Sequence, residues 1–489
     1  MKAQSGRAAV IGVIALTLAA LAPAATAAAI APPKARIDTG VVVGVEKEPA
    51  AVFRAIPYAA PPVGPLRWKP PAPAAAWRGE RAAVENGPAC PQKIHPGGAP
   101  NGGGYSGPTS EDCLTLDVTA PLHAHRAPVM VWIFGGGNSA GATDLPSYDA
   151  AAFARDGVVW VAMNYRLGLL GFFAHPALTA EAPRDQPLAS YGLMDQIAAL
   201  KWVKRNIAAF GGDPANVTIF GESAGGTDVL RLMAIGAARG LFEKAIVQSG
   251  GWWEPSEDLA HGEADGAAAA TRLGLPGAKA TAAQLRVVAV DALTAQRAGS
   301  GLLTVDGRLV KESGRAAFIA GHVAPVPLII GSNSNEASLI GPAASGEGGA
   351  LHRALFNDQF VAAPSRWVAR KQASRARTWL YYFSYVPERQ RGIRPGTNHA
   401  SEIPFVFDSL DAVPGRTPLV TPSERAAATL AHSCWVGFAK TGVPVCAGGQ
   451  AWPAWDPAAE QLLEFGDPPA LRAHFRKDRL DAQDRAAGR

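Results

Sequence analysis

The chain has 489 residues, of which 48% are hydrophobic and 18% are charged, and its formal net charge is +5. This composition is ordinary for a globular protein with a sizeable core, and length alone does not decide the number of domains. The basic residues are scattered rather than gathered with aromatic residues, which excludes a nucleic-acid-binding stripe.

The N-terminus is predicted to be a signal peptide that covers residues 1–27. Lys2 and Arg7 give a basic start, residues 8–22 form an apolar run, and residues 25–27 read A-T-A, a small-residue cleavage site. The apolar run is too short to cross a bilayer comfortably, and no later stretch is long and apolar enough to do so. We therefore expect an exported protein, periplasmic or secreted, without a stable membrane span.

The first half of the mature chain contains several strand and helix patterns. The prolines of residues 53–71 forbid a helix and predict an extended segment wrapped over the surface. Residues 129–134 and 158–165 are short apolar runs, typical of buried parallel strands. Residues 195–210 carry apolar residues three or four apart and predict an amphipathic helix. Strand, helix and strand at this spacing predict βαβ units and a mostly parallel sheet.

Residues 217–226 read V-T-I-F-G-E-S-A-G-G, a strand that runs into a G-x-S-x-G turn and the start of a helix. A serine hydroxyl is a weak nucleophile, and a tight turn holds it out where a base can take its proton. The candidate nucleophile is therefore Ser223. Residues 137–141 also match G-x-S-x-G, but a loop follows Ser139, which we expect to be a loop residue near an oxyanion hole.

The segment F-G-E-S-A-G-G at residues 220–226 resembles the serine motif of the type-B carboxylesterases, the family that includes the cholinesterases. Residues 192–196, 199–207 and 210–214 resemble the same family, in the same order. The resemblance implies the α/β-hydrolase fold, with a mostly parallel central sheet flanked by helices. It also implies one catalytic domain, which would cover residues 28–489.

The resemblance also assigns roles around the serine. In this fold a glycine-rich loop and the residue after the nucleophile supply the N–H groups of the oxyanion hole, here Gly136, Gly137 and Ala224. Asn138 stands where the family usually has an aromatic residue. Ser249 ends the strand predicted at residues 244–249 and matches the family serine that supports the catalytic acid without touching the substrate.

The four cysteines fit an oxidising compartment. None lies in a C-x-x-C pair or beside clustered histidines, so no metal site is expected. The family resemblance implies a disulfide between Cys90 and Cys113. Whether Cys434 and Cys446 are also bridged stays open at this point.

The catalytic acid should come next in the chain, because the order in this fold is serine, then acid, then histidine. Residues 326–330 form a strand-like run, and the loop after it contains Glu336, which matches the family acid. The competitors Asp306 and Asp358 follow no such strand. The sequence therefore favours Glu336 as the acid.

The candidate base is His399. It follows a predicted strand at residues 380–386 and stands in a segment that resembles the catalytic histidine segment of the family. His432 lies in a helix-like stretch, and His352 and His474 lie in featureless surroundings.

Together these residues predict a serine carboxylic ester hydrolase that forms an acyl-enzyme on small or medium esters, with no metal or organic cofactor. Acetylcholine is disfavoured, because the segment between Cys90 and Cys113 lacks the tryptophan that binds choline in cholinesterases. The alternatives are a lipase or polymer-ester hydrolase and, less favoured, a non-catalytic binding protein of the same fold. The natural ester, its chain preference, any lid and the oligomeric state stay open.

Overall fold

The computed structural model describes residues 1, 31–94, 105–251, 257–296, 303–340, 347–414 and 419–489. The predicted signal peptide lies, apart from Met1, outside the described residues. Residues 33–489 form one compact unit. In the part of the chain that is described, no helix is long and apolar enough to cross a membrane.

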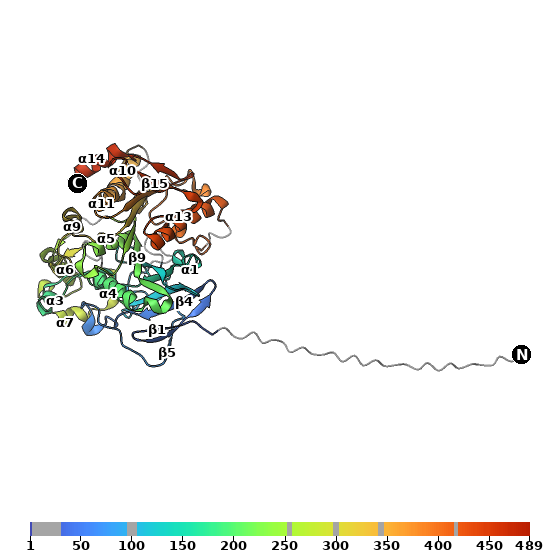
Figure 1. Ribbon diagram of the computed structural model, residues 1–489. Helices are drawn as coiled ribbons and strands as arrows, with labels where there is room; N and C mark the ends of the chain where they lie inside the picture. Colours follow the sequence, from blue (N-terminus) through green and yellow to red (C-terminus); the bar gives the residue numbers. More distant parts are fainter. Residues whose placement is uncertain (2–30, 95–104, 252–256, 297–302, 341–346, 415–418) are drawn as a thin grey trace. The chain divides into compact units, whose positions relative to one another are not determined.

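An eleven-stranded mixed sheet runs through this unit in the order β16–β15–β14–β13–β10–β9–β7–β8–β6–β4–β3 (Figure 1). The strands are β3 (Val45–Lys47), β4 (Ala50–Pro57), β6 (Thr115–Pro121), β7 (Ala127–Ile133), β8 (Val159–Met163), β9 (Gly212–Glu222), β10 (Lys244–Gln248), β13 (Leu328–Asn333), β14 (Thr378–Phe383), β15 (Leu462–Phe465) and β16 (Ala470–Arg472). The seven neighbouring strands from β15 to β8 run parallel, and the strands at both ends pair antiparallel. The prediction of a mostly parallel sheet is confirmed.

The central strands are buried along their whole length, and apolar through most of it, because helices cover both faces of the sheet. Every residue of β8, β10, β13 and β14 is buried. Buried parallel strands show continuous apolar runs rather than alternation, and this is the pattern by which they could be predicted. The core is built around these strands.

Figure 1 shows helices on the two sides of the sheet. One side carries α4 (Tyr191–Asn206), α5 (Ala224–Ala234) and α11 (Ala363–Ala373), and the other carries α1 (Ala151–Arg155) and α13 (Pro422–Thr441). Further helices are α6 (Leu259–Arg272), α9 (Gly314–Ala320), α10 (Glu347–Asn357) and α14 (Lys477–Ala486). The helices α5 and α11 contact the central strands directly.

Two predicted segments differ from the structure. The helix expected at residues 195–210 begins earlier, at Tyr191, and is almost wholly buried rather than half exposed, because it packs into the core on several sides. The segment expected to wrap over the surface begins inside the sheet: its first residues belong to β4, where Phe53 and Ile56 are buried. The prolines act only from Pro57 onward, where β4 ends.

Candidate active site

The turn between β9 and α5 presents Ser223. Its backbone has φ 57° and ψ −124°, a strained conformation for a residue with a side chain. The Ser223 N–H donates to Gln248 O on β10 at 2.8 Å, which holds the turn against the sheet. A Cβ on Gly225 would lie 2.0 Å from Ile133 O, and a Cβ on Gly221 would lie 2.6 Å from Gly225 O. Only glycine fits at these two positions, because backbone packs against backbone.

The ends of β13 and β14 bring Glu336 and His399 together. His399 Nδ1 lies 2.5 Å from Glu336 Oε2, and both side chains are buried. The other carboxylate oxygen of Glu336 accepts hydrogen bonds from Ser249 Oγ and Asn333 N, each at 2.7 Å. These contacts hold Glu336 in the orientation that an acid needs in order to fix an imidazole ring.

Among the described contacts, the Ser223 hydroxyl makes no hydrogen bond to His399. His399 Nε2 lies instead 3.1 Å from Glu222 Oε1, and these two atoms are not aligned as a hydrogen bond. Glu222 directly precedes Ser223, so this imidazole nitrogen lies beside the turn that carries the serine. Catalytic hydrogen bonds in enzymes without bound substrate are often long or poorly aligned and tighten only when substrate is bound.

Three buried carboxyl groups surround His399. Burial raises the pKa of Glu222 to about 8, with His399 opposing the shift and Glu402 and Glu336 adding to it. Burial also raises the pKa of Glu402, although Asn333 donates a hydrogen bond to its carboxylate. Burial disfavours the charged form of His399, but Glu222, Glu336 and Glu402 outweigh burial and raise its pKa to about 9.

Sequence reasoning did not assign a role to Glu222 or Glu402. Glu222 is the variable position before the serine in G-x-S-x-G, and Glu402 follows His399 by three residues. Their closeness to named catalytic candidates is a signal that was present in the sequence. Their convergence on one imidazole is visible only in three dimensions.

The predicted oxyanion loop lies against the serine turn. A Cβ added to Gly135 would lie 2.9 Å from Ser223 Cβ. Gly136 has φ 105° and Gly137 has φ 63°, and a Cβ on Gly136 would lie 2.2 Å from Ala140 O. Ala224 is the first residue of α5, where helix geometry leaves backbone N–H groups without an intrahelical acceptor.

Ser139, the alternative serine, lies in an exposed turn of the same loop. Its N–H and its hydroxyl both donate to Gly136 O, at 3.1 Å each. No helix begins directly after it: the next one in the chain is the short 3-10 helix Pro146–Tyr148, so Ser139 lies in a loop.

A model of the carboxylesterase family matches residues 31–349 and 349–483. The chain belongs to the carboxylesterase family. It is 34% identical over 477 residues to the fumonisin B1 esterase of Sphingopyxis macrogoltabida, which covers 88% of this chain and 85% of that protein. It is 34% identical over 469 residues to the para-nitrobenzyl esterase of Bacillus subtilis, with 87% and 93% covered.

A solved structure of a PNB esterase matches with a TM-score of 0.80 and 30% sequence identity, covering 92% of this chain and 98% of that one. This carboxylesterase therefore has the α/β-hydrolase fold and is an enzyme, a carboxylic ester hydrolase. The less favoured alternative, a non-catalytic binding protein, is set aside.

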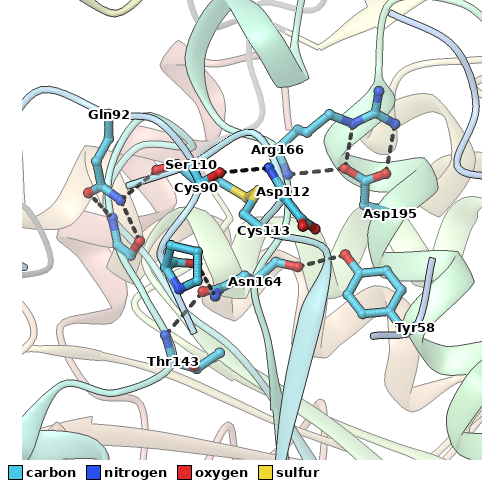
Figure 2. The surroundings of a disulfide bond; sticks show 12 residues. Tyr58, Cys90, Gln92, Ser110, Asp112, Cys113, Thr143, Asn164, Arg166 and Asp195 are labelled. Atoms are coloured by element: carbon cyan, nitrogen blue, oxygen red, sulfur yellow. Dashed lines mark hydrogen bonds and ion pairs between the residues drawn. A yellow bond between two sulfur atoms is a disulfide. The ribbon is translucent and has the colours of Figure 1, made fainter. Parts of the chain in front are cut away.

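The carboxylesterase contains the expected disulfide between Cys90 and Cys113 (Figure 2). Near it, Gln92 binds both backbone groups of Gly141: its Nε2 donates to Gly141 O and its Oε1 accepts from Gly141 N, each at 2.8 Å. Gly141 ends the loop that begins at Gly135. The disulfide segment thus anchors the far end of the predicted oxyanion loop, residues 135–141. The structure also joins Cys434 to Cys446, the pair that the sequence left open.

The competing acids of the carboxylesterase have other partners. Asp306 accepts hydrogen bonds from the backbone N–H groups of Leu188, Arg308 and Val310. Asp358 pairs with two arginines close to or within the C-terminal helix α14.

The competing histidines also lie elsewhere. His432 is buried, with Nδ1 2.8 Å from Val406 O, and His352 and His474 are exposed. Of the four histidines that follow Glu336, only His399 contacts it in the part of the chain that the structure describes.

Proposed function

We propose that this carboxylesterase works through Ser223, His399 and Glu336 and forms an acyl-enzyme intermediate. The observation that carries the proposal is the buried contact between His399 and Glu336, which lies beside the turn that holds Ser223 in a strained conformation. A base, a group that orients it and an exposed nucleophile are the parts that such a mechanism requires.

In the first half-reaction His399 Nε2 turns from Glu222 to Ser223 Oγ and takes its proton while Oγ attacks the ester carbonyl. Glu336 stabilises the imidazolium that forms, and Ser249 keeps Glu336 in place. The N–H groups of Gly136, Gly137 and Ala224 bind the carbonyl oxygen as it becomes negative. His399 then returns the proton to the departing alcohol.

In the second half-reaction water attacks the acyl-enzyme. His399 takes a proton from the water, the carbonyl oxygen again becomes negative in the oxyanion hole, and collapse of this intermediate breaks the bond to Ser223 Oγ. The proton returns to Ser223, and the carboxylic acid leaves. Both half-reactions use the same groups. Overall, one ester and one water give one carboxylic acid and one alcohol.

The substrate is proposed to be a small or medium carboxylic ester. The relatives named above act on fumonisin B1 and on para-nitrobenzyl esters, which are both small molecules compared with a polymer. A choline ester is disfavoured, because the segment between Cys90 and Cys113 contains no tryptophan.

The lipase alternative is favoured by one observation. Exposed apolar residues gather next to the site on α10 and the segment after Glu336, which contact each other: Leu339, Ile340, Leu351 and Leu355. In the same region, the centroid of the Phe360 ring lies 6.3 Å from the centroid of the His399 ring, and Phe360 stacks on Phe356. Such a surface suits an ester with a long apolar acyl chain.

Export is also part of the proposal. The predicted signal peptide at residues 1–27 and the two disulfides support it, because disulfides persist in oxidising compartments.

Hydrolysis of p-nitrophenyl acetate, butyrate and decanoate tests the proposed machinery and the acyl preference. We expect Ser223→Ala to lower kcat by about 10⁴-fold or more, as removal of a catalytic serine does in other hydrolases. Ser139→Ala should keep most of the activity, because its backbone N–H still donates to Gly136 O. The reverse result would show that the nucleophile is misassigned. A rate that rises sharply above the solubility limit of the decanoate would favour the lipase alternative.

A further inference from the structure

A buried hydrogen bond joins the oxyanion loop to the helix that carries the serine. Asn138, the residue after Gly137, donates from Nδ2 to Asp228 Oδ1 at 3.2 Å. Asp228 lies on α5, five residues after Ser223. Asn138 is 7% exposed and Asp228 is fully buried, so solvent does not compete for this bond.

Asp228 is held by donors on three sides. Besides Asn138, its Oδ1 accepts from Arg231 Nη1 at 2.9 Å, and its Oδ2 accepts from Gln196 Nε2 on α4 at 2.7 Å. Burial raises the pKa of Asp228, while the Arg231 charge and the amide donors oppose the shift. A carboxylate with these partners only accepts hydrogen bonds, so the Asn138 amide must turn its NH₂ group toward it.

The backbone of Asn138 is fixed as well. Its φ is 52°, a left-handed conformation that asparagine tolerates better than most residues with a side chain. Its carbonyl accepts from Gly168 N at 2.7 Å, and its Oδ1 lies 3.3 Å from Tyr165 Oη. Tyr165 Oη also lies 2.7 Å from Phe134 O, at the other end of the glycine run.

The proposed oxyanion hole is assembled from two segments of chain. Gly136 and Gly137 contribute N–H groups from the loop, and Ala224 contributes one from the first turn of α5. The bond from Asn138 to Asp228 is a direct side-chain link between these two segments. A shift of about 1 Å between catalytic groups is enough to lower a rate about 100-fold.

We infer that Asn138 and Asp228 are positioning residues, which hold the loop and α5 in the relative placement that the oxyanion hole requires. This inference rests on the proposed function, because it takes the oxyanion donors from there. It also explains why an amide, rather than an aromatic ring, suits position 138 in this chain: the Asp228 carboxylate needs a donor from the loop.

The first test is Asn138→Ala, measured with p-nitrophenyl butyrate beside Asn86→Ala. The control removes another bond between an asparagine and an aspartate, from Asn86 Nδ2 to Asp144 Oδ2 at 3.0 Å, at an exposed site. We expect Asn138→Ala to lower kcat by about 10- to 100-fold with KM nearly unchanged, because the oxyanion forms only after binding. Asn86→Ala should behave as the wild type.

A second measurement separates positioning from general damage to the fold. A trifluoromethyl ketone that adds to the serine mimics the tetrahedral intermediate, and its affinity should fall by the same factor as kcat/KM in Asn138→Ala. Asp228→Asn, which keeps the size of the side chain and one acceptor oxygen, should lose less than Asn138→Ala. Melting temperatures of all variants, measured together, show that the folded protein is being compared.

The outcomes are distinguishable from those for the proposed function. If Ser223→Ala is inactive while Asn138→Ala keeps the wild-type kcat and analogue affinity, the positioning role is wrong and the triad stands. A rise in KM at constant kcat would likewise overturn it, because Asn138 would then contact the substrate itself. If Ser223→Ala keeps its activity, the proposed function fails and this inference falls with it.

Discussion

At the scale of single residues, the charge around His399 sets when it can act as a base. In the proposed mechanism only the neutral imidazole takes the serine proton, so we expect activity to be present above the pKa of His399 and to be lost as pH falls through it. Burial lowers that pKa, but the neighbouring carboxylates outweigh burial and raise it to about 9. We therefore expect the acidic limb of the activity profile to lie at higher pH than for an ordinary histidine.

Glu222→Gln removes a negative charge 3.1 Å from His399 Nε2 and keeps the shape of the side chain. The pKa of His399 should fall, and the acidic limb of kcat/KM against pH should move to lower pH. Glu257 is partly exposed and lies outside the site, so Glu257→Gln serves as the control. An acidic limb that stays in place in Glu222→Gln would mean that Glu222 is uncharged when the enzyme is active.

A residue's role could be predicted from the sequence when its position along the chain, such as directly after a strand, is enough to place it in the site. Glu336 could be chosen because it follows a strand that ends at the carboxyl edge of the sheet, and the structure places it in contact with His399. The approach of Glu222 to the same imidazole depends on which way one side chain turns. The bond between Asn138 and Asp228 joins residues ninety positions apart, and no local pattern reports it.

At the scale of elements, the two disulfides allow a matched comparison. They close loops of 23 and 12 residues, and chain-entropy arguments assign each about 3 kcal/mol of stability. The double variant Cys90→Ser/Cys113→Ser and the double variant Cys434→Ser/Cys446→Ser should therefore lose similar free energies of unfolding, measured by urea denaturation. Their activities should differ.

Only the first disulfide lies next to Gln92, which holds the end of the proposed oxyanion loop at Gly141. We expect kcat to fall in Cys90→Ser/Cys113→Ser and to stay near the wild-type value in the other double variant, both measured where the variants are folded. Equal kcat values in the two variants would show that the loop does not depend on this anchor.

Most of the parallel strands of the central sheet were predictable because burial on both faces leaves a largely continuous apolar run. Each predicted strand after residue 120 matches an observed one within a few residues. The strands β3, β4, β6, β15 and β16 were not predicted. Of these, β4 is an antiparallel strand beside a proline-rich stretch. The prolines that follow β4 dominated the local pattern, while pairing with β6 decided the structure.

At the scale of the whole molecule, a buried ion pair ties distant segments together (Figure 2). Arg166 follows β8, and its guanidinium donates to both carboxylate oxygens of Asp195 on α4 at 2.7 Å each, and to Lys69 O at 2.9 Å. Arg166→Met leaves a carboxylate buried without its partner. We expect a loss of about 3–5 kcal/mol in the free energy of unfolding.

The exposed pair of Arg425 and Asp411 offers the comparison, since both side chains are more than half exposed and their contacts are also bidentate. Arg425→Met should cost at most about 1 kcal/mol. If the two variants lose equal free energies of unfolding in the same urea titration, burial of the Arg166 pair does not increase its contribution to stability.

The edge strands of the eleven-stranded sheet affect whether copies of the enzyme can associate through the sheet. The outermost strands, β3 and β16, have three residues each, and the exposed side chains of Lys47 and Arg472 lie on them. Long, flat, apolar edges invite strand addition from a second chain, and short charged ones discourage it. In crowded solution this sheet gives a neighbouring copy little backbone to pair with, so fibril-like growth from its edges is disfavoured.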